Sequence, residues 1–522
     1  MTRRAPGWLW GAGVAVAALA LLPAVYLAVR AAEAEADTWS LLLRDRMWGL
    51  LWRTVGLAAA VTACAAALSL PLAWLTTRTD LPGRRVWTVL LCVPLAVPTF
   101  VSGYVLLAAF GTGGALEAPL MRWGLPVPPV YGFPGALLAL TVTTYPYLFL
   151  ALRAGLLAQD PAWLEGARSL GLTPARAFWR VTAPLLRPAF ASGALLVGLY
   201  VLSDFGAVAL LQYDAFSRAI YVQYDGAYDR TYAALLGLVL VAVTVGVLAL
   251  EVRLRGKAGY HRSAKGAARA AAPVVLGRWR VPALLLCGAV VAVGVGLPVA
   301  VLLYWGVQGL VGGEGELVLG PALNSVLASV LGAVAAVVGA LPLAFLAARH
   351  PGRLTLVLER AAYAGYALPP IVLALSLVFL GVRALPFLYG TLAMLVLAYL
   401  VRFLPQAVGV VRGALLQLNP HLPEAAASLG QPPRAVLRRV TVPLLRPGLL
   451  AGAALVFLTA MKELPATLLL APIGFDTLAT RVWSATAEGR FAEAAVPALV
   501  LMAVSALGVG LLVSQEGGDT PG

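Results

Sequence analysis

The stretch "EGARSLGLTPARAFWRVTAPLLRP", Glu165 to Pro188, places four arginines and a glutamate in a chain in which 61% of the residues are hydrophobic. A close copy, "EAAASLGQPPRAVLRRVTVPLLRP", occupies residues 424–447, at a constant shift of 424 − 165 = 259. Charged side chains are costly in hydrocarbon, so both copies are expected outside the core of a bilayer. The repetition indicates that the chain is an internal duplication.

The sequence around these copies predicts an all-α polytopic membrane protein. The mean hydropathy is +0.88, only 12% of the residues are charged, and many apolar runs exceed the roughly 20 residues that a helix needs to cross a bilayer. Twelve spans are predicted: 8–29, 54–76, 87–110, 135–158, 189–212, 231–250, 281–311, 322–347, 357–380, 388–411, 448–471 and 492–514. This pattern excludes an assembly of soluble domains.

The net charge of +15 does not indicate nucleic-acid binding, because the basic residues lie in short segments between spans. By the positive-inside rule, the side that carries the basic segment 251–280 is cytoplasmic, and so are both termini. Cysteine and histidine show no metal-ligand spacing. The three cysteines, Cys64, Cys92 and Cys287, fall in apolar spans and are expected to be buried thiols.

The predicted organisation has three parts. Residues 1–250 form a first repeat of six spans with the first polar loop (160–188), residues 251–280 form a basic cytoplasmic linker, and residues 281–522 form a second repeat with the second polar loop (419–447). Upstream of the loops, matching residues of the two repeats are 271 positions apart instead of 259, so Pro98 corresponds to Pro369. Because six spans separate the polar loops, both face the cytoplasm. The repeats are therefore expected to be related by a pseudo-twofold axis along the membrane normal.

Each polar loop is predicted to form two short helices joined by a tight turn. In the first loop Asp160 precedes the first helix, Gly171 ends it, Pro174 begins the second helix, and Pro184 turns the chain back to the membrane. The matching residues of the second loop are Asn419, Gly430, Pro433 and Pro443. A single loop of this kind is most simply a cap on its own bundle, but two copies on one side favour a pair of docking elements.

The two loops resemble the cytoplasmic signature loop of permease subunits of bacterial ATP-binding-cassette importers. The first copy departs from the pattern with Gly166 in place of alanine. In addition, "SDFGAVALL" (203–211) and "MKELPATLLLAPIGFDTLATRVW" (461–483) are similar to sequences of the fused ferric-iron uptake branch, whose relatives handle thiamine. The resemblance implies that the loops contact the ATPase through Glu165, Ala167, Gly171, Glu424, Ala425 and Gly430.

The same resemblance implies the partner proteins and the cellular location. Two ATPase subunits, one per loop, and an extracytoplasmic solute-binding protein would assemble with the chain in the bacterial cytoplasmic membrane. The chain has no phosphate loop of its own: Gly256 and Lys257 form the only Gly-Lys pair, and alanine follows. We therefore expect a transport subunit that is not an enzyme, binds no cofactor and leaves ATP to its partners.

Two acids are candidates for the transport pathway or its gate. Asp204 and Glu463 share the shift of 259 and lie in apolar sequence, where a carboxylate serves transport or a structural ion pair. Lys462 precedes Glu463 and is a possible counter-charge. Two such acids favour a cation, iron or cationic thiamine, over an oxyanion such as sulfate. The resemblance makes ferric iron the expected solute.

The run "QYDAFSRAIYVQYDGAYDRTY" (212–232) supplies outer-face candidates for binding a hard cation, although an interfacial aromatic belt also explains its tyrosines. The candidates are Tyr213, Tyr221, Tyr224 and Asp225. The alternatives left open are a thiamine-type permease and, in another class, an ion-gradient-driven secondary transporter that uses Asp204 and Glu463. A membrane enzyme lacks any cluster of nucleophile, base or metal ligands.

Overall fold

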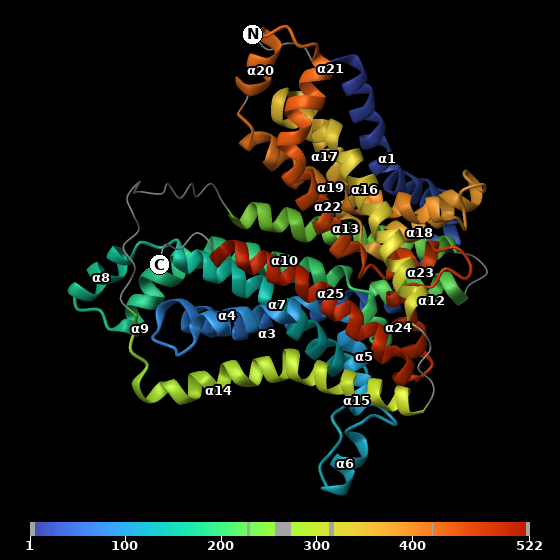
Figure 1. The fold of residues 1–522 in the computed structure, drawn as a ribbon. Helices are drawn as coiled ribbons and strands as arrows, with labels where there is room; N and C mark the ends of the chain where they lie inside the picture. The colour runs from blue at the N-terminus through green and yellow to red at the C-terminus, as the bar shows by residue number, and fades with distance from the viewer. Residues whose placement is uncertain (1–5, 227–229, 256–272, 313–317, 420, 518–522) are drawn as a thin grey trace. The chain divides into compact units, whose positions relative to one another are not determined.

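The structure is a computed structural model that describes residues 6–226, 230–255, 273–312, 318–419 and 421–517. Over these residues the chain is helical, and its only β-type pairing is an isolated bridge between Thr79 and Val274 (Figure 1). Ten helices within these ranges are long and apolar enough to cross a membrane, or up to twelve if each of two bent pairs is one span. The prediction of an all-α polytopic membrane protein is confirmed. Most of the expected linker, residues 256–272, lies outside the described part.

The described chain divides into two compact units that do not follow the order of the sequence. Unit 1 comprises residues 1–43, 219–241 and 316–484. Unit 2 comprises residues 44–218, 242–315 and 485–522. Each unit therefore draws its first and last segments from different halves of the chain.

Unit 2 is built on α3, α7 and α10, which pack side by side. Helix α15 and the last helix α25 contact each other and complete this unit from the other half of the chain. Its elements are α3 (Asp45–Arg78), α4 (Arg84–Cys92), η2 (Val93–Ala96), α5 (Thr99–Phe110), α6 (Glu117–Arg122), α7 (Phe133–Leu157), α8 (Pro161–Ser169), α9 (Pro174–Ala177), η3 (Phe178–Thr182), α10 (Ala183–Ser203), α11 (Gly206–Leu210), η4 (Gly277–Trp279), α14 (Arg280–Val291), η5 (Ala292–Gly296), α15 (Leu297–Val311) and α25 (Phe491–Gly517).

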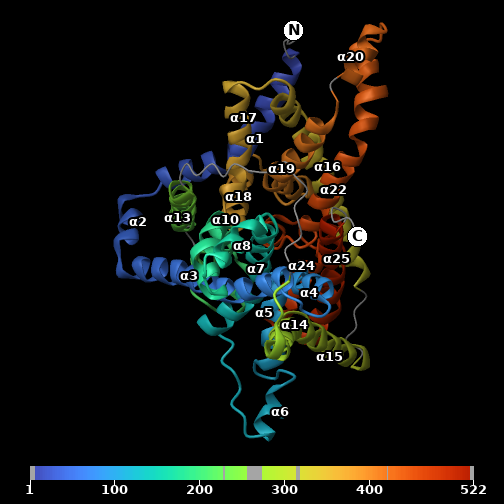
Figure 2. The same ribbon diagram turned by 90° about the vertical axis from the view of Figure 1, so that its left-hand side faces the viewer.

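Unit 1 repeats this plan with α16, α19 and α22 packed side by side (Figure 2). The first helix of the chain, α1, packs on α16, α17 and α18, so it also crosses to the other half of the sequence. The elements are α1 (Gly7–Ala32), α2 (Ala36–Ser40), η1 (Leu41–Leu43), α16 (Leu319–Arg349), α17 (Arg353–Ala367), α18 (Pro370–Arg383), α19 (Leu392–Gln417), α20 (His421–Ser428), α21 (Pro433–Val436), η6 (Leu437–Thr441), α22 (Val442–Ala460) and α23 (Pro465–Leu470). Helices α12 (Phe216–Gly226), α13 (Thr231–Arg255) and α24 (Leu478–Ala487) run across the unit boundaries.

The third predicted span of each repeat is broken at a proline. The two parts of the first are bent by 90° at Pro98, and those of the second by 96° at Pro369. A residue before proline is pushed from the helical to the extended region, and Val97 (ψ 113°) and Leu368 (ψ 127°) both adopt it. The matched prolines therefore act as matched breaks in the two spans.

The second parts of the broken spans, α5 and α18, are buried on nearly every side. Both are apolar around their whole circumference, as expected of helices without a lipid-facing side. Each packs against the short helix that follows a candidate pathway acid, α5 against α11 and α18 against α23. Both acids are buried next to this pairing, each within its own unit.

The crossings of α7 with α10 and of α19 with α22 require one glycine each. A Cβ atom on Gly155 would lie 2.8 Å from that of Ala189, and one on Gly448 would lie 2.3 Å from that of Ala414. These positions correspond at the shift of 259, but glycine and alanine have changed places. Small residues at such crossings let helix backbones approach closely.

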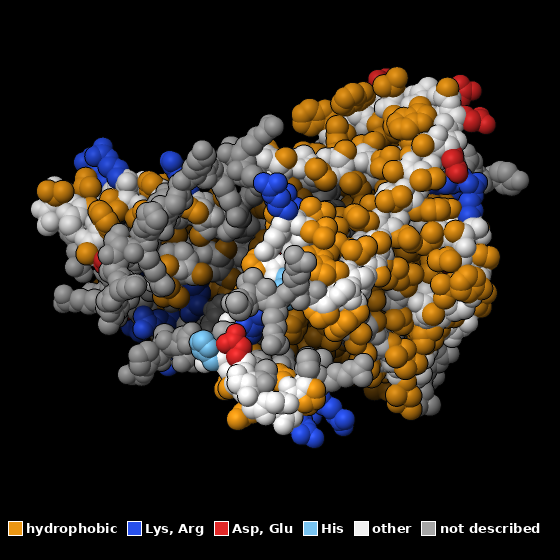
Figure 3. Space-filling model, turned by 90° about the horizontal axis from the view of Figure 1, so that it is seen from above, with side chains coloured by type: hydrophobic (Ala, Val, Ile, Leu, Met, Phe, Trp, Pro, Cys, Tyr) orange, Lys and Arg blue, Asp and Glu red, His pale blue; other side chains and the backbone are white. Residues whose placement is uncertain are grey.

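Much of the surface seen in Figure 3 is covered by hydrophobic side chains, and the charged residues form small scattered groups. Large apolar side chains such as Leu285 and Leu310 are about two-thirds exposed, at 67% and 70%. Exposed apolar surface on this scale is typical of helices that face lipid.

Candidate functional site

The polar loops have the predicted helix, turn and helix in both repeats. Asp160 accepts a hydrogen bond from the N–H of Ala162 (2.9 Å), and Asn419 accepts one from the N–H of His421 (3.0 Å), so each caps its short helix. Gly171 and Gly430 follow these helices with φ of +84° and +79°, the left-handed conformation that glycine adopts without strain.

The second helix of each loop differs from the prediction. Pro184 was expected to turn the chain, but α9, the π-helical η3 and α10 run on without interruption, and Thr182 and Ala183 keep helical dihedrals. The second loop repeats this through α21, η6 and α22. Proline is tolerated in the first turn of a helix, and the π turn accommodates its missing N–H. Each loop is therefore joined rigidly to the span that follows it.

The predicted contact residues lie in the first short helix of each loop and in the turn that follows it. Glu165 is in α8, but its side chain lies outside the described part. Ala167 is buried and Gly171 is exposed, whereas Ala425 and Gly430 are both exposed. The Glu424 carboxylate is exposed, with one oxygen 3.3 Å from Nδ1 of His421. Beside the two glycines lie large exposed leucines, Leu170 at 85% and Leu429 at 83%.

Two arginines that the sequence analysis did not select hold the base of the polar loops. Arg78, the last residue of α3, donates from Nη2 to the carbonyls of Leu156 (2.5 Å) and Gln159 (3.4 Å). Arg349, the last residue of α16, donates to the carbonyls matched with these, those of residues 415 (3.4 Å) and 418 (3.2 Å). Their common shift of 271 was visible in the sequence, but their partners were not.

Asp204, in unit 2, is buried and caps the short helix α11. Its Oδ1 accepts hydrogen bonds from the N–H groups of Ala207 (3.1 Å) and Val208 (3.4 Å), and Thr99 at the start of α5 also bonds to the carboxyl. The Ser217 hydroxyl donates to the backbone carbonyl of Asp204 (2.5 Å). The carboxylate is thus satisfied by dipoles rather than by a cation.

Glu463, in unit 1, is equally buried but has an ionic partner. Its Oε2 lies 2.8 Å from Nε of Arg402 on α19, while its Oε1 is buried without a hydrogen-bond partner in the described structure. The residue matched with Arg402 in the first repeat is Thr143, so the charge pair belongs to the second repeat alone. Among described contacts Lys462 forms no ion pair with Glu463, and the counter-charge is Arg402. Its signal in sequence was a lone arginine inside a predicted span.

The outer-face tyrosines have separate surroundings. Tyr213, in unit 2, donates to the carbonyl of Arg53 (2.8 Å). In unit 1, the ring of Tyr221 meets that of Trp483, and Arg230 stacks on Tyr224 at 4.5 Å. Burial, with the neighbouring Tyr389, raises the pKa of Tyr224 to about 12, which makes the phenolate form still less accessible than in an ordinary tyrosine. Asp225 is exposed, and Tyr228 and Asp229 of the same run lie outside the described residues.

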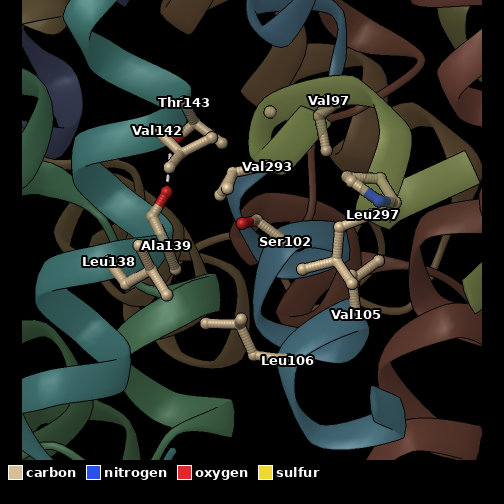
Figure 4. A pocket seen from close by; sticks show the side chains of 12 residues that line it. Val97, Ser102, Val105, Leu106, Leu138, Ala139, Val142, Thr143, Val293 and Leu297 are labelled. Atoms are coloured by element: carbon tan, nitrogen blue, oxygen red, sulfur yellow. Dashed lines mark hydrogen bonds between the residues drawn. The ribbon is translucent and has the colours of Figure 1, made fainter. Parts of the chain in front are cut away.

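Within the described ranges no group of three or more His, Cys, Asp or Glu side chains could hold a metal ion. A cavity in unit 2 between α5, α7 and η5 is lined almost entirely by apolar side chains, among them Leu106, Val142 and Val293 (Figure 4). It has room for about one water molecule, which excludes a hydrated or chelated solute from the cavity as it stands. No disulfide joins the three cysteines, and Cys92 and Cys287 are buried.

Comparison with known proteins agrees with this arrangement. The family described as "Binding-protein-dependent transport system inner membrane component" matches the chain twice, over residues 69–255 and 340–515. The chain is 34% identical over 519 residues to the Fe(3+)-transport system permease protein FbpB 2 of Haemophilus influenzae, covering 98% of this chain and 99% of that protein.

Two further relatives match shorter stretches. The sulfate transport system permease protein CysW of Escherichia coli K12 is 32% identical over 39% of this chain and 70% of its own length. The molybdenum transport system permease protein ModB of the same strain is 33% identical over 30% of this chain and 69% of its own. The doubled family match and the full-length relative establish that the chain belongs to the inner-membrane permease components of binding-protein-dependent, ATP-binding-cassette import systems.

Proposed function

We propose that this protein is the permease of an ATP-driven importer of ferric iron in a bacterial cytoplasmic membrane. The observation that carries the proposal is the similarity to an Fe(3+)-transport permease over 98% of the chain, through both repeats. An extracytoplasmic binding protein delivers the solute. Two ATPase subunits, one on each polar loop, supply the energy.

The form of the polar loops supports the docking role. Both present a large exposed leucine beside a left-handed glycine, at the end of a short helix. Because α9 and α21 run without a break into membrane helices, a movement of either loop reaches the bilayer-spanning part directly. The absence of a phosphate loop in the sequence agrees with ATP hydrolysis by the partner subunits rather than by this chain.

The packing of α1 supports a cytoplasmic N-terminus. Near the start of α1, a Cβ on Gly13 would lie 2.9 Å from the side chain of Leu346, which is three residues before the end of α16. That end of α16 contacts the carbonyl of Leu418, just before α20. The start of the chain and the second polar loop therefore lie at one end of unit 1 (Figure 1).

In this proposal Asp204 and Glu463 line or gate the pathway. Both are buried beside a broken helix, and one carboxylate oxygen of Glu463 has no hydrogen-bond partner among the described residues. A buried, unpaired carboxylate oxygen is a ligand that a hard cation prefers. Arg402 and Lys462 beside it favour a second candidate, an oxyanion permease like the sulfate and molybdenum relatives.

The experiment is uptake of radioactive iron into proteoliposomes that contain the permease, its ATPase and its iron-loaded binding protein. We expect uptake that requires enclosed ATP and persists when ion gradients are dissipated. Uptake driven by a gradient without ATP would identify a secondary transporter, and uptake of sulfate or molybdate instead of iron would support the oxyanion candidate.

The docking role is tested separately by Gly430→Leu. A non-glycine residue pays roughly 1–2 kcal/mol for the left-handed conformation, so the turn should distort and the ATPase should bind more weakly. Gly413→Leu, a glycine inside α19 with open space around its Cβ, is the control for a bulky residue at the same end of the unit. Equal ATPase affinity of the parental protein and Gly430→Leu would contradict this role.

A further inference from the structure

The hydrogen bonds of Arg78 and Arg349 satisfy backbone carbonyls at the ends of two helices. The last carbonyls of α7 and α19 lie beyond the regular hydrogen bonding of their helices, and that of Leu156 accepts only a long backbone bond, from the N–H of Gln159 (3.3 Å). The chain continues there with Asp160-Pro161 and Asn419-Pro420. Proline has no N–H to offer. A guanidinium satisfies two such carbonyls at once, and its charge complements the negative end of the helix dipole.

Neither guanidinium has a carboxylate partner within the described residues. Both therefore act on backbone carbonyls alone. The contact also occurs separately in the two units, between matched residues of α3 and α7 in one and of α16 and α19 in the other. Since a surface arginine would have no reason to select the same carbonyls twice, the repetition indicates a shared task.

The position of the contact suggests the task. Helix α8 begins two residues after Gln159, and α20 begins three residues after Leu418. Arg78 and Arg349 thus hold the chain at the point where each polar loop leaves the membrane helix. In the first loop the Gln159 side chain also donates to the carbonyl of Thr182 (3.3 Å), so the start of the loop is tied to its return helix.

We propose that Arg78 and Arg349 are positioning residues that transmit movement of the polar loops to α3 and α16. A loop displaced by its ATPase pulls on the ends of α7 or α19, and the guanidinium carries that displacement to the neighbouring helix. These helix pairs make the most extensive interhelical contacts in their units, so a shift of one requires the other to follow. The inference rests on the proposed docking of the ATPase on the loops.

The test uses the assembled importer in nanodiscs, with Arg78→Gln, Arg349→Gln and the double variant. The matched controls are Arg85→Gln and Arg353→Gln, which remove exposed arginines near the same helix ends that form no hydrogen bond or ion pair with described residues. Three quantities are measured: ATPase affinity for the permease, ATP hydrolysis with and without loaded binding protein, and the melting temperature. Lysine variants at both sites test whether a positive charge alone restores function. A lysine ammonium can bond to one of the two carbonyls, but it lacks the fork of donors with which arginine bonds to both.

We expect ATPase affinity to stay within about two-fold, and the stimulation of hydrolysis by loaded binding protein to fall about ten-fold, the scale of one lost charge-assisted hydrogen bond. Lysine should restore part of the stimulation, and the control variants should keep all of it. An unchanged ratio of stimulated to basal hydrolysis in the double variant would overturn the proposal. So would a loss of melting temperature and affinity with that ratio preserved, which would indicate a helix cap only.

The proposal and the proposed function fail in different ways. If the parental permease does not bind an ATPase through its polar loops, Gly430→Leu leaves ATPase binding unchanged and the docking role itself is wrong. If docking is as proposed, Gly430→Leu weakens binding while the arginine variants bind normally and lose stimulation.

Discussion

The buried pair of Arg402 and Glu463 allows the sharpest test of the site. The two side chains are 20% and 7% exposed, with 2.8 Å between Nε and Oε2. Removing one member of a buried pair leaves an uncompensated charge and costs about 3–5 kcal/mol, whereas replacing both by apolar residues of similar size is often neutral. We therefore expect Arg402→Met and Glu463→Met each to lower the free energy of unfolding by about 3 kcal/mol, and the double variant by far less.

A double-mutant cycle measures this coupling from denaturant unfolding in mixed micelles. The matched control is the pair of Arg412 and Glu359 in the same unit, which is more exposed, at 40% and 17%. Solvent screening reduces its expected coupling to about 1 kcal/mol or less. Additive effects of the two single substitutions at Arg402 and Glu463 would refute the reasoning, because independent residues do not form a compensating buried pair.

The same variants separate a structural pair from a pathway residue. If the Glu463 carboxylate takes part in transport, the double variant regains stability but stays defective in iron uptake. If the pair is structural, uptake recovers together with stability. Uptake at the parental rate by the double variant would therefore remove Glu463 from the pathway.

Three further predictions concern packing, helix propensity and pH. Gly448→Ala should destabilise the α19–α22 crossing by roughly 1–3 kcal/mol through overpacking, and adding Ala414→Gly, which copies the first repeat, should restore the melting temperature. Gly166→Ala should stabilise α8 by about 1 kcal/mol and slow amide exchange there, since open space surrounds that position; equal exchange would contradict this. The hydrogen bond from Arg30 and the charge of Arg383 lower the pKa of Glu33. This contribution to stability is present at neutral pH and is lost as pH falls through the lowered pKa, so melting curves of Glu33→Gln should lack that acid-dependent part.

Local rules read from the sequence predicted much of the fold. Pro98 and Pro369 were matched in sequence, and both break a span, because the restriction on the residue before proline acts wherever the chain lies. Asp160 and Gly171 likewise frame a helix as their local chemistry requires. Pro184 shows the limit of such rules. A proline there was expected to end the helix, but with a π turn before it the helix continues through Pro184 without a break.

Long-range packing could not be read in the same way. The apolar pattern of α1 predicts a span, but nothing in that pattern says that α1 packs on helices more than 300 residues later. The partner of Glu463 was missed for the same reason, because Arg402 is 61 residues away and only the fold brings them together. The acid of each repeat could be found because Asp204 and Glu463 occupy matched positions in the sequence. Only the structure shows that the two carboxylates have different partners.

The interleaving of the two units has a consequence for biosynthesis. Unit 1 cannot close until residue 484 has left the ribosome, and unit 2 waits for α25 at the end of the chain. During translation α1 must remain in the lipid without its final neighbours for most of the time that synthesis takes. A nascent chain that stops before residue 484 would therefore leave both units incomplete, whereas one that stops within α25 would leave only unit 2 incomplete.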